Sequence, residues 1–235
     1  MLEQGVTMPF GVRSRRLRTA CALLAAALPW AVRRPILVHV LGHSIHPTAR
    51  VGFSLVDVGH LELGPGAEIG HLNVVRGLDR VTLGRSAVLA HLNWVNAVRR
   101  DRGFLQGVDR SPELVLGPCA RIMVLHLLDC TARIELRERA TVAGYQSLLM
   151  THSFDPATHS QTAQPIVVGE RTVLAARVTV LPGAEVAGHS LVAAGAVVVR
   201  PLHGSHHLYG GVPARALGTL APDTGFLVAD EEIAR

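Results

Sequence analysis

An aliphatic residue recurs at every sixth position between residues 168 and 198, and this spacing restricts the fold more than any other feature. A period of six fits neither an α-helix, whose period is 3.6 residues, nor a half-buried strand, whose period is 2. It fits a short strand followed by a tight turn, so that three such units form one coil of a parallel β-helix. The alternative is a Val/Ala-rich sheet that matches by chance. The run comprises Val168, Leu174, Val180, Val186, Val192 and Val198.

The same register continues upstream with interruptions, from Ile45 onward. Two coils are near copies, LGPGAEIGHLNVV from Leu63 and LGRSAVLAHLNWV from Leu83, and a later pair has the same offset of twenty residues. We expect about six coils between Ile45 and Val199, stacked around a core that no single repeat could bury. The upstream anchors are Ile45 and Val51; Leu63, Ile69 and Val75; Leu83, Leu89 and Val95; Leu116, Ile122 and Leu128; Leu136, Val142 and Leu148.

Two interruptions are longer than a corner of the coil. They are residues 96–112 (NAVRRDRGFLQGVDRSP) and residues 151–165 (THSFDPATHSQTAQP). Insertions in a solenoid become external loops, which commonly carry binding or chemistry. The first holds four arginines and two aspartates, and the second holds two histidines. We therefore expect the functional residues in these two loops.

The sequence divides into a basic and apolar helical segment (1–44), the β-helix (45–200) and a C-terminal tail (201–235). A hydrophobic fraction of 49% with only 4% aromatic residues suits the narrow interior of a β-helix. The net charge of +5 is confined to residues 1–40, which hold six arginines and one glutamate. No basic face or recognisable module accompanies it, so a nucleic-acid partner is not expected.

The N-terminal segment has two interpretations. Residues 14–17 (SRRL) before the apolar stretch Ala20–Val32 have the outline of a twin-arginine signal, but this stretch is too short to span a bilayer. We favour a helix that covers the unpaired strand edges at the open end of the β-helix. Peripheral contact with anionic lipid through the arginines is the second interpretation. Three cysteines without a pairing pattern indicate reduced thiols, so we expect a cytoplasmic protein, with membrane-peripheral attachment as the variant.

Thirteen histidines make any single one weak evidence for a site. His126 falls in line with Asn73, Asn93 and Gln146, and we expect these four to form a ladder of buried polar side chains that joins coil to coil. A metal site needs three or four converging ligands, and the spacing does not indicate one. No metal is therefore expected.

Specific motifs follow residue 151. They are HSFD from His152, VVGERTVLAARVTVLPGAEVAGHSLVAAGAVVVRP from Val167, and the closing GGVPAR that ends at Arg215. This part resembles the hexapeptide acyltransferases, and more narrowly the O-acetyltransferase branch with the colanic-acid, maltose and galactoside acetyltransferases. The resemblance is strong from Thr151 onward and holds only at the repeat level before it. It implies a left-handed coil sense, a homotrimer, and acetyl-CoA or another acyl-CoA as co-substrate in a groove between subunits.

The resemblance also implies roles for individual residues. His152 takes the position of the catalytic histidine, a general base that removes a proton from the acceptor hydroxyl as its oxygen attacks the thioester. Asp155 is expected to orient the ring or to contact the acceptor. His159 is a weaker base candidate, and we assign Asn93 and His159 as candidate acceptor-binding residues.

The resemblance in the last two coils and the closing motif also implies which residues bind the acyl-CoA donor. Ala176, Ala194 and Gly195 match positions where the family backbone lies against the pantetheine arm. Arg200 and Arg215 match basic residues near the nucleotide phosphates, which arginine grips in a bidentate manner. Ala replaces Gly at positions 175, 187 and 193, which leaves the length of the acyl chain open.

The expected function is therefore an acyl-CoA-dependent O-acyltransferase, in the first place an O-acetyltransferase, acting on a hydroxyl of a sugar or other polyhydroxylated acceptor. Two alternatives stay open. One is an N-acyltransferase that acts on an amino sugar, because its base and donor groove would look alike. The other is a catalytically silent β-helix that serves as a scaffold or binding module.

Overall fold

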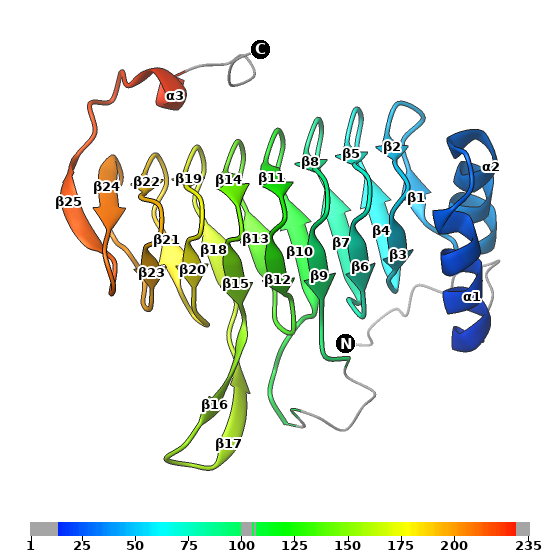
Figure 1. Cartoon of the computed structure of the whole chain (residues 1–235), viewed down its shortest axis with the longest axis horizontal. Helices are drawn as coiled ribbons and strands as arrows, with labels where there is room; N and C mark the ends of the chain where they lie inside the picture. The colour runs from blue at the N-terminus through cyan, green and yellow to red at the C-terminus, as the bar shows by residue number, and fades with distance from the viewer. Residues whose placement is uncertain (1–13, 100–104, 106, 229–235) are drawn as a thin grey trace, which may run out of the picture.

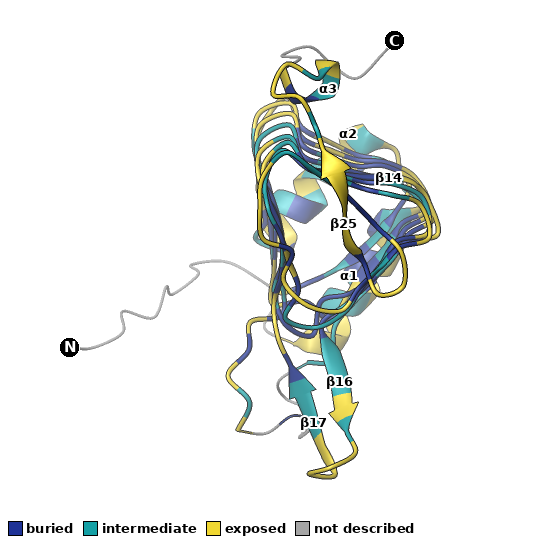
Figure 2. Ribbon diagram, turned by 90° about the vertical axis from the view of Figure 1, so that its left-hand side faces the viewer, coloured by how far each residue is buried: buried dark blue, intermediate teal, exposed yellow. Residues whose placement is uncertain are grey.

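The computed structural model describes residues 14–99, 105 and 107–228. Most of this chain winds into a parallel β-helix whose coils stack along one axis (Figure 1). Viewed along that axis, the coils enclose a roughly triangular interior (Figure 2). The all-β parallel β-helix expected from the sequence, with its N-terminal helical segment and short C-terminal extension, is confirmed.

Three sheets form the three sides, each coil contributes one short parallel strand to each sheet, and sheet B has two further strands after the last coil. Sheet A contains β1 (Ser44–Ile45), β4 (His60–Leu63), β7 (Arg80–Leu83), β10 (Glu113–Leu116), β13 (Ile134–Leu136), β18 (Ile166–Val168) and β21 (Glu185–Val186). Sheet B contains β2 (Arg50–Val51), β5 (Glu68–Ile69), β8 (Val88–Leu89), β11 (Arg121–Val124), β14 (Thr141–Tyr145), β19 (Val173–Leu174), β22 (Leu191–Val192), β24 (His207–Gly210) and β25 (Arg215–Thr219). Sheet C contains β3 (Leu55–Asp57), β6 (Val74–Arg76), β9 (Trp94–Asn96), β12 (Leu127–Asp129), β15 (Leu148–Met150), β20 (Thr179–Val180) and β23 (Val197–Val198).

The β-helix has seven coils, one more than the sequence led us to expect. Sheets A and C each contain seven strands, one from each coil. In the first coil, the buried residue of sheet C is Val56, five positions after Val51 rather than six. This shortened step interrupts the six-residue period. The third anchor of the first coil is therefore missed when the coils are counted by that period.

A polar ladder runs through the interior at the corner between sheets B and C. Oδ1 of Asn73 accepts a hydrogen bond from the backbone N–H of Asn93 (2.9 Å), and Oδ1 of Asn93 accepts one from the N–H of His126 (2.9 Å). Nδ1 of His126 in turn accepts one from the N–H of Ser147 (3.1 Å). Each bond joins one coil to the next and satisfies an N–H group that water cannot reach. The ladder predicted through Asn73, Asn93 and His126 is confirmed.

The ladder prediction is wrong for its fourth member. Gln146 is exposed and Ser147 is buried in its place, and the buried anchor of the same coil is Leu149 rather than Leu148. The cause is one extra residue in β14, where the pairing with β11 shifts and Gly144 adopts φ +65°. Such a bulge moves every following side chain to the opposite face.

The N-terminal segment covers the first coil. Helices α1 (Arg15–Ala26) and α2 (Trp30–Pro35) and the π-helical turn η1 (Ile36–Val40) lie at that end of the β-helix (Figure 1). Arg33 is buried and donates hydrogen bonds to the carbonyl oxygens of Val51 (3.3 Å), Gly52 and Ser54 (2.8 Å). These carbonyls face away from the second coil, so no strand can pair with them. The expected cover over the open edge is therefore present, and arginine side chains complete it.

Two further elements leave the β-helix. The antiparallel pair β16 (His152–Asp155) and β17 (Ser160–Ala163) projects from one corner as a hairpin (Figures 1 and 2). At the C-terminal end, β25 pairs antiparallel with β24 and leads to the short helix α3 (Gly225–Val228). Arg171 Nη1 donates a hydrogen bond to the carbonyl of Leu227 (2.8 Å), which ties α3 back to the sixth coil.

Candidate functional site

Both long insertions leave the β-helix at the corner between sheets C and A. The first begins after β9 and the second is the hairpin that follows β15. Leu105 from the first insertion forms a small apolar cluster with Ala132 and with Ala163 at the base of the hairpin, and Val108 packs against it. The middle of the first insertion therefore contacts the base of the second, although the two loops lie far apart in the chain.

The central feature of this corner is a contact between His152 and Asp129. Nδ1 of His152 lies 2.5 Å from Oδ2 of Asp129, and the backbone N–H of His152 donates to the same oxygen (3.1 Å). The Asp129 side chain is 10% exposed, whereas the imidazole is 33% exposed. An ionised carboxylate only accepts, so the ring proton is held on Nδ1 and the lone pair is on Nε2. This tautomer suits a general base.

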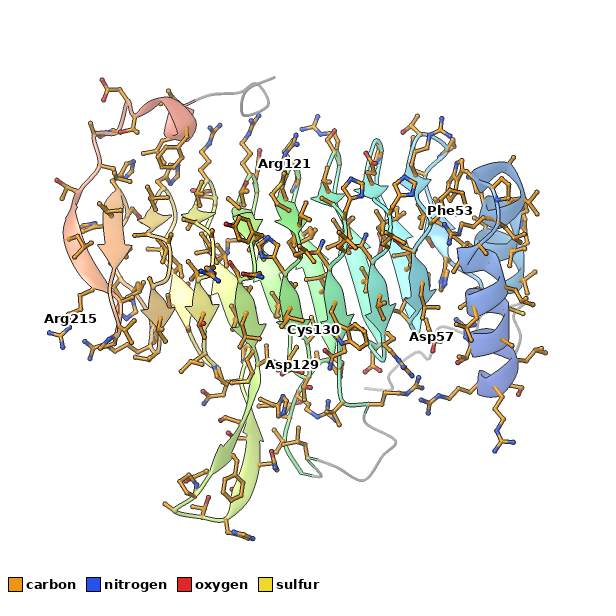
Figure 3. The ribbon with its side chains drawn as sticks, in the orientation of Figure 1. Phe53, Asp57, Arg121, Asp129, Cys130 and Arg215 are labelled. Atoms are coloured by element: carbon orange, nitrogen blue, oxygen red, sulfur yellow. The ribbon has the colours of Figure 1, made fainter. Side chains whose placement is uncertain are left out.

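The Asp129 carboxylate is itself fixed by its neighbours. Oδ1 accepts from the hydroxyl of Thr131 (2.6 Å), and Oδ2 accepts from the backbone N–H of Thr151 (3.2 Å). The Thr151 hydroxyl donates to the Asp129 carbonyl (2.7 Å). Figure 3 labels Asp129 beside the base of the hairpin. Because its oxygens are held in this way, Asp129 can define the orientation of the His152 ring without moving.

The neighbouring cysteine does not supply an alternative nucleophile. Cys130 is completely buried, and this burial, followed by the charge of Asp129, raises the pKa of its thiol. A thiolate is the reactive form, and the site disfavours it.

Asp155 and His159 lie away from this contact, at the tip of the hairpin. The Asp155 carboxylate accepts from the Thr158 hydroxyl (2.8 Å) and from the Ala157 N–H (2.9 Å), and these bonds lower its pKa. His159 lies in the turn, with its ring edge-on to Phe154 (5.4 Å between centroids). The orienting contact that we expected from Asp155 is made by Asp129.

Asn93 occupies the interior. It is 1% exposed, and its amide bonds to Asn73, to the N–H of His126 and to the carbonyl of Met123. This position does not fit the expected contact between Asn93 and an acceptor, and Asn93 belongs to the polar ladder instead.

The residues expected to bind the donor lie on the opposite edge of sheet C. Ala176, Ala194 and Gly195 form turns at the corner between sheets B and C, where the N–H of Gly195 donates to the carbonyl of Ala176 (3.0 Å). A Cβ atom built on Gly195 would meet nothing within 4 Å, so the backbone there is open to a ligand. His152 follows the strand that crosses sheet C in the fifth coil. At about 3.3 Å per extended residue, the two corners are roughly 15–20 Å apart in one chain.

The two expected phosphate-binding arginines lie at the C-terminal end of the β-helix. Arg200 follows β23 and Arg215 begins β25, and both are exposed. Figure 3 shows Arg215 at this end of the molecule, many coils away from Phe53 and Asp57. Within one chain, the backbone positions Ala176, Ala194 and Gly195 therefore lie at the other corner from the expected base, whereas Arg200 follows its sheet C strand at the same corner as His152, two coils further along.

Among residues 14–99, 105 and 107–228, no group of three histidine, cysteine or acidic residues could hold a metal ion. Within the same ranges, no helix has the length and apolar character needed to cross a membrane.

Comparison with known proteins gives similarity at the level of the fold. No family model matches the sequence, and no curated protein matches it. Similar solved structures include a hexapeptide-repeat acetyltransferase from Vibrio cholerae complexed with acetyl-CoA (18% identity, 88% of each chain, TM-score 0.45). They also include a maltose O-acetyltransferase from Clostridium difficile (10% identity, 88% of this chain and 86% of that chain, TM-score 0.38). A variant of GDP-perosamine N-acetyltransferase from Caulobacter crescentus, complexed with CoA and GDP-perosamine, matches at 22% identity over 80% of this chain and 65% of that chain, with a TM-score of 0.35. Because these TM-scores are below 0.5, we draw nothing about the reaction or the acceptor from them.

Proposed function

We propose that this chain is an acyl-CoA-dependent O-acyltransferase, in its simplest form an O-acetyltransferase, with His152 as general base. The observation that carries the proposal is the contact between His152 and the buried Asp129 at the corner where both insertions meet. The motifs after residue 151 that resemble the hexapeptide acyltransferases support it. The acceptor is a hydroxyl of a sugar or a related polyhydroxylated molecule.

In the proposed reaction, Nε2 of His152 takes the proton of the acceptor hydroxyl as its oxygen attacks the thioester carbonyl of the donor. Asp129 accepts the Nδ1 hydrogen and stabilises the imidazolium that forms. The tetrahedral intermediate then collapses, the C–S bond breaks, and the leaving CoA sulfur takes up the proton carried by Nε2, which restores the neutral imidazole. No acyl-enzyme is needed, because the thioester is already activated.

The separation between the expected base and the expected donor residues supports a site built between chains. Two corners roughly 15–20 Å apart in one chain can face one another when a second chain packs against sheet C. The outer surface of this sheet carries Leu127, which is 52% exposed, and its edge carries Leu72 at 65%. Large exposed apolar side chains of this kind are typical of subunit contacts. We therefore propose the homotrimer as the active form.

The test is acetyl transfer from acetyl-CoA to a panel of neutral, acidic and amino sugars, measured by release of the CoA thiol. His152→Ala should lower kcat by roughly 10²- to 10⁴-fold and leave the KM for acetyl-CoA within a few-fold. His39→Ala, which removes an exposed histidine in η1, is the matched control and should retain activity. Full activity in His152→Ala would contradict the proposal. Transfer to amino sugars alone would replace it with N-acylation.

A further inference from the structure

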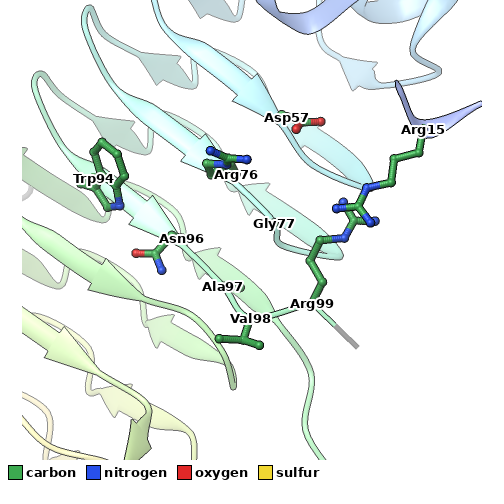
Figure 4. A pocket seen from close by; sticks show the side chains of 9 residues that line it. All are labelled: Arg15, Asp57, Arg76, Gly77, Trp94, Asn96, Ala97, Val98 and Arg99. Carbon is green, nitrogen blue, oxygen red and sulfur yellow. The ribbon is translucent and has the colours of Figure 1, made fainter. Parts of the chain in front are cut away.

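A pocket of about 320 Å³ opens on the outer surface of sheet C, against β3, β6 and β9. Three arginines line it, Arg15 from α1, Arg76 from β6 and Arg99 from the segment after β9, together with Asp57, Trp94 and Asn96 (Figure 4). None of these residues has a role in the proposed reaction so far. The pocket brings together cationic groups, an aromatic surface and amide and carboxylate groups.

The strand register connects this pocket to the catalytic pair. Asp57, Arg76, Asn96 and Asp129 are direct register partners on four successive strands of sheet C. The residue before each of them, such as Val75 or Leu128, points into the core. Because side chains alternate along a strand, the side chains of all four leave the backbone on the outer face of sheet C. Neighbouring strands lie about 4.8 Å apart, so Arg76 sits about 10 Å from Asp129.

Hydrogen bonds hold the pocket wall and the catalytic pair in a fixed relation. The N–H of Val98 donates to the hydroxyl of Thr131 (3.0 Å), and that hydroxyl donates to the Asp129 carboxylate (2.6 Å). Arg110 is buried and Nη1 donates to the carbonyls of both Val98 (2.6 Å) and Thr131 (2.9 Å). A ligand seated against Val98 would thus be held at a set distance from His152.

The lining chemistry indicates the kind of ligand. Figure 4 shows the side chains of Arg15 and Arg99 extending toward one another on one side of the pocket, with Trp94 and Asn96 on the other. Within the described part of the chain, Arg76 forms no salt bridge. Guanidinium groups bind carboxylate or phosphate in a planar, bidentate manner. The indole of Trp94, 48% exposed, offers a flat surface for the apolar face of a sugar ring.

We infer that the acceptor is an anionic glycan, with a carboxylate or phosphate group held in this pocket while the hydroxyl that is acylated lies at His152, beyond Asp129. Because Arg76 and Asp129 are already about 10 Å apart, the anionic group and this hydroxyl belong to different sugar residues of the acceptor. The inference rests on the proposed acyltransferase function, because it defines the acceptor of the same site. It adds Arg76 as a residue that selects the acceptor by its charge.

The experiment uses three matched probes, which are cellobiose, cellobiouronic acid and cellobiose 6′-phosphate. We expect binding to the full-length protein, measured by calorimetry without acetyl-CoA, to be at least about 10-fold tighter for one of the two anionic probes than for cellobiose. The comparison between the anionic probes distinguishes a carboxylate from a phosphate. Arg76→Gln should remove that preference, whereas Arg50→Gln, at an exposed arginine of sheet B, should leave it unchanged.

The outcomes separate this inference from the proposed function. Equal binding of the three probes, or an unchanged preference in Arg76→Gln, would overturn the inference, while transfer to a neutral sugar would still stand as evidence for the enzyme. If Arg76→Gln instead raised the KM for acetyl-CoA, the pocket would bind the donor and the inference would fall. His152→Ala should bind the anionic probe with the wild-type Kd, since the inference assigns binding to the pocket and proton removal to His152.

Discussion

Nδ1 of His152 lies 2.5 Å from Oδ2 of Asp129, a residue 23 positions earlier that belongs to the preceding coil. The β-helix creates this contact, because β12 and β15 are neighbours in sheet C and Asp129 is opposite Met150 in the register. The histidine is the second residue after Met150, where the chain leaves the coil for the hairpin. A solenoid can thus build an acid–base pair from two residues that neither share a motif nor lie near each other in sequence.

Asp129→Asn should lower kcat by roughly 10- to 10³-fold. An amide can donate to Nδ1, which would place the ring proton on Nε2, the wrong tautomer for a base. The KM for acetyl-CoA should stay within a few-fold.

Asp129 also bonds to Thr131 and Thr151, so the fold of the variant needs its own measurement. Thermal unfolding of Asp129→Asn should be compared with that of Thr131→Val, which removes one of the same bonds but leaves the carboxylate in contact with His152. If Thr131→Val lost as much activity as Asp129→Asn at equal stability, the orienting role of the carboxylate would be wrong.

Arg215→Ala should raise the KM for acetyl-CoA by roughly 10- to 100-fold, because a charge-assisted phosphate contact is worth about 1.5–3 kcal/mol. Arg215 is exposed and begins the last strand, so its removal leaves the core intact. Acetyl-pantetheine lacks the nucleotide phosphates, so its KM should hardly change in Arg215→Ala. Equal losses with both donors would assign Arg215 to the fold or to a subunit contact.

The sequence predicted the β-helix well because its core repeats locally. Each anchor is set by its own turn and strand, and the six-residue period survives wherever no residue is added or lost. The predictions failed at the places where one residue was added or lost. The short step to Val56 hid one complete coil, and the bulge at Gly144 moved Ser147 and Leu149 into the positions expected for Gln146 and Leu148. A single insertion of this kind leaves no clear compositional signal.

The site was predicted only in part, for a different reason. His152 carries a recognisable motif, whereas Asp129 follows a core anchor in a sequence (LLDC) that reads as an ordinary strand. Its partner is fixed by the register between coils. The six-residue period does not give this register until the two extra residues of each twenty-residue coil and the bulge at Gly144 are placed. The one available signal was an acidic residue directly after an anchor, twenty-three positions before the motif histidine.

Light scattering should give a mass of three times 25.1 kDa for the protein in dilute solution. Mixed trimers test whether the site lies between chains. His152→Ala and Arg215→Ala subunits, co-refolded in equal amounts and assayed at low acetyl-CoA, should regain about a quarter of the wild-type activity, because some sites then combine an intact histidine with an intact arginine from a neighbour. If both residues acted within one chain, mixing would restore nothing.

Two buried histidines should make the fold sensitive to acid. Burial lowers the pKa of His126 to about 4 and that of His43 to about 3. In the unfolded chain both would titrate near 6.5. Below that pH the unfolded state binds protons at these histidines and the folded state does not. The free energy of unfolding therefore has its full value above about pH 6.5 and falls as the pH drops toward 4. His126 alone should lower the free energy of unfolding by about 3 kcal/mol over this range.

His126→Asn should reduce the loss of stability at acid pH while it preserves the hydrogen bonds of the polar ladder. Asn73 and Asn93 already accept the N–H of the next coil through Oδ1, so an asparagine at position 126 can accept the N–H of Ser147 in the same way. Urea unfolding between pH 7 and pH 4 should then show a clearly shallower fall in the free energy of unfolding for the variant than for the wild type, with His43 accounting for the part that remains. The variant will start from a lower stability at pH 7, because the smaller side chain leaves part of the ring's volume empty. The two curves should therefore converge or cross as the pH falls. Parallel curves would show that His126 does not titrate in this range.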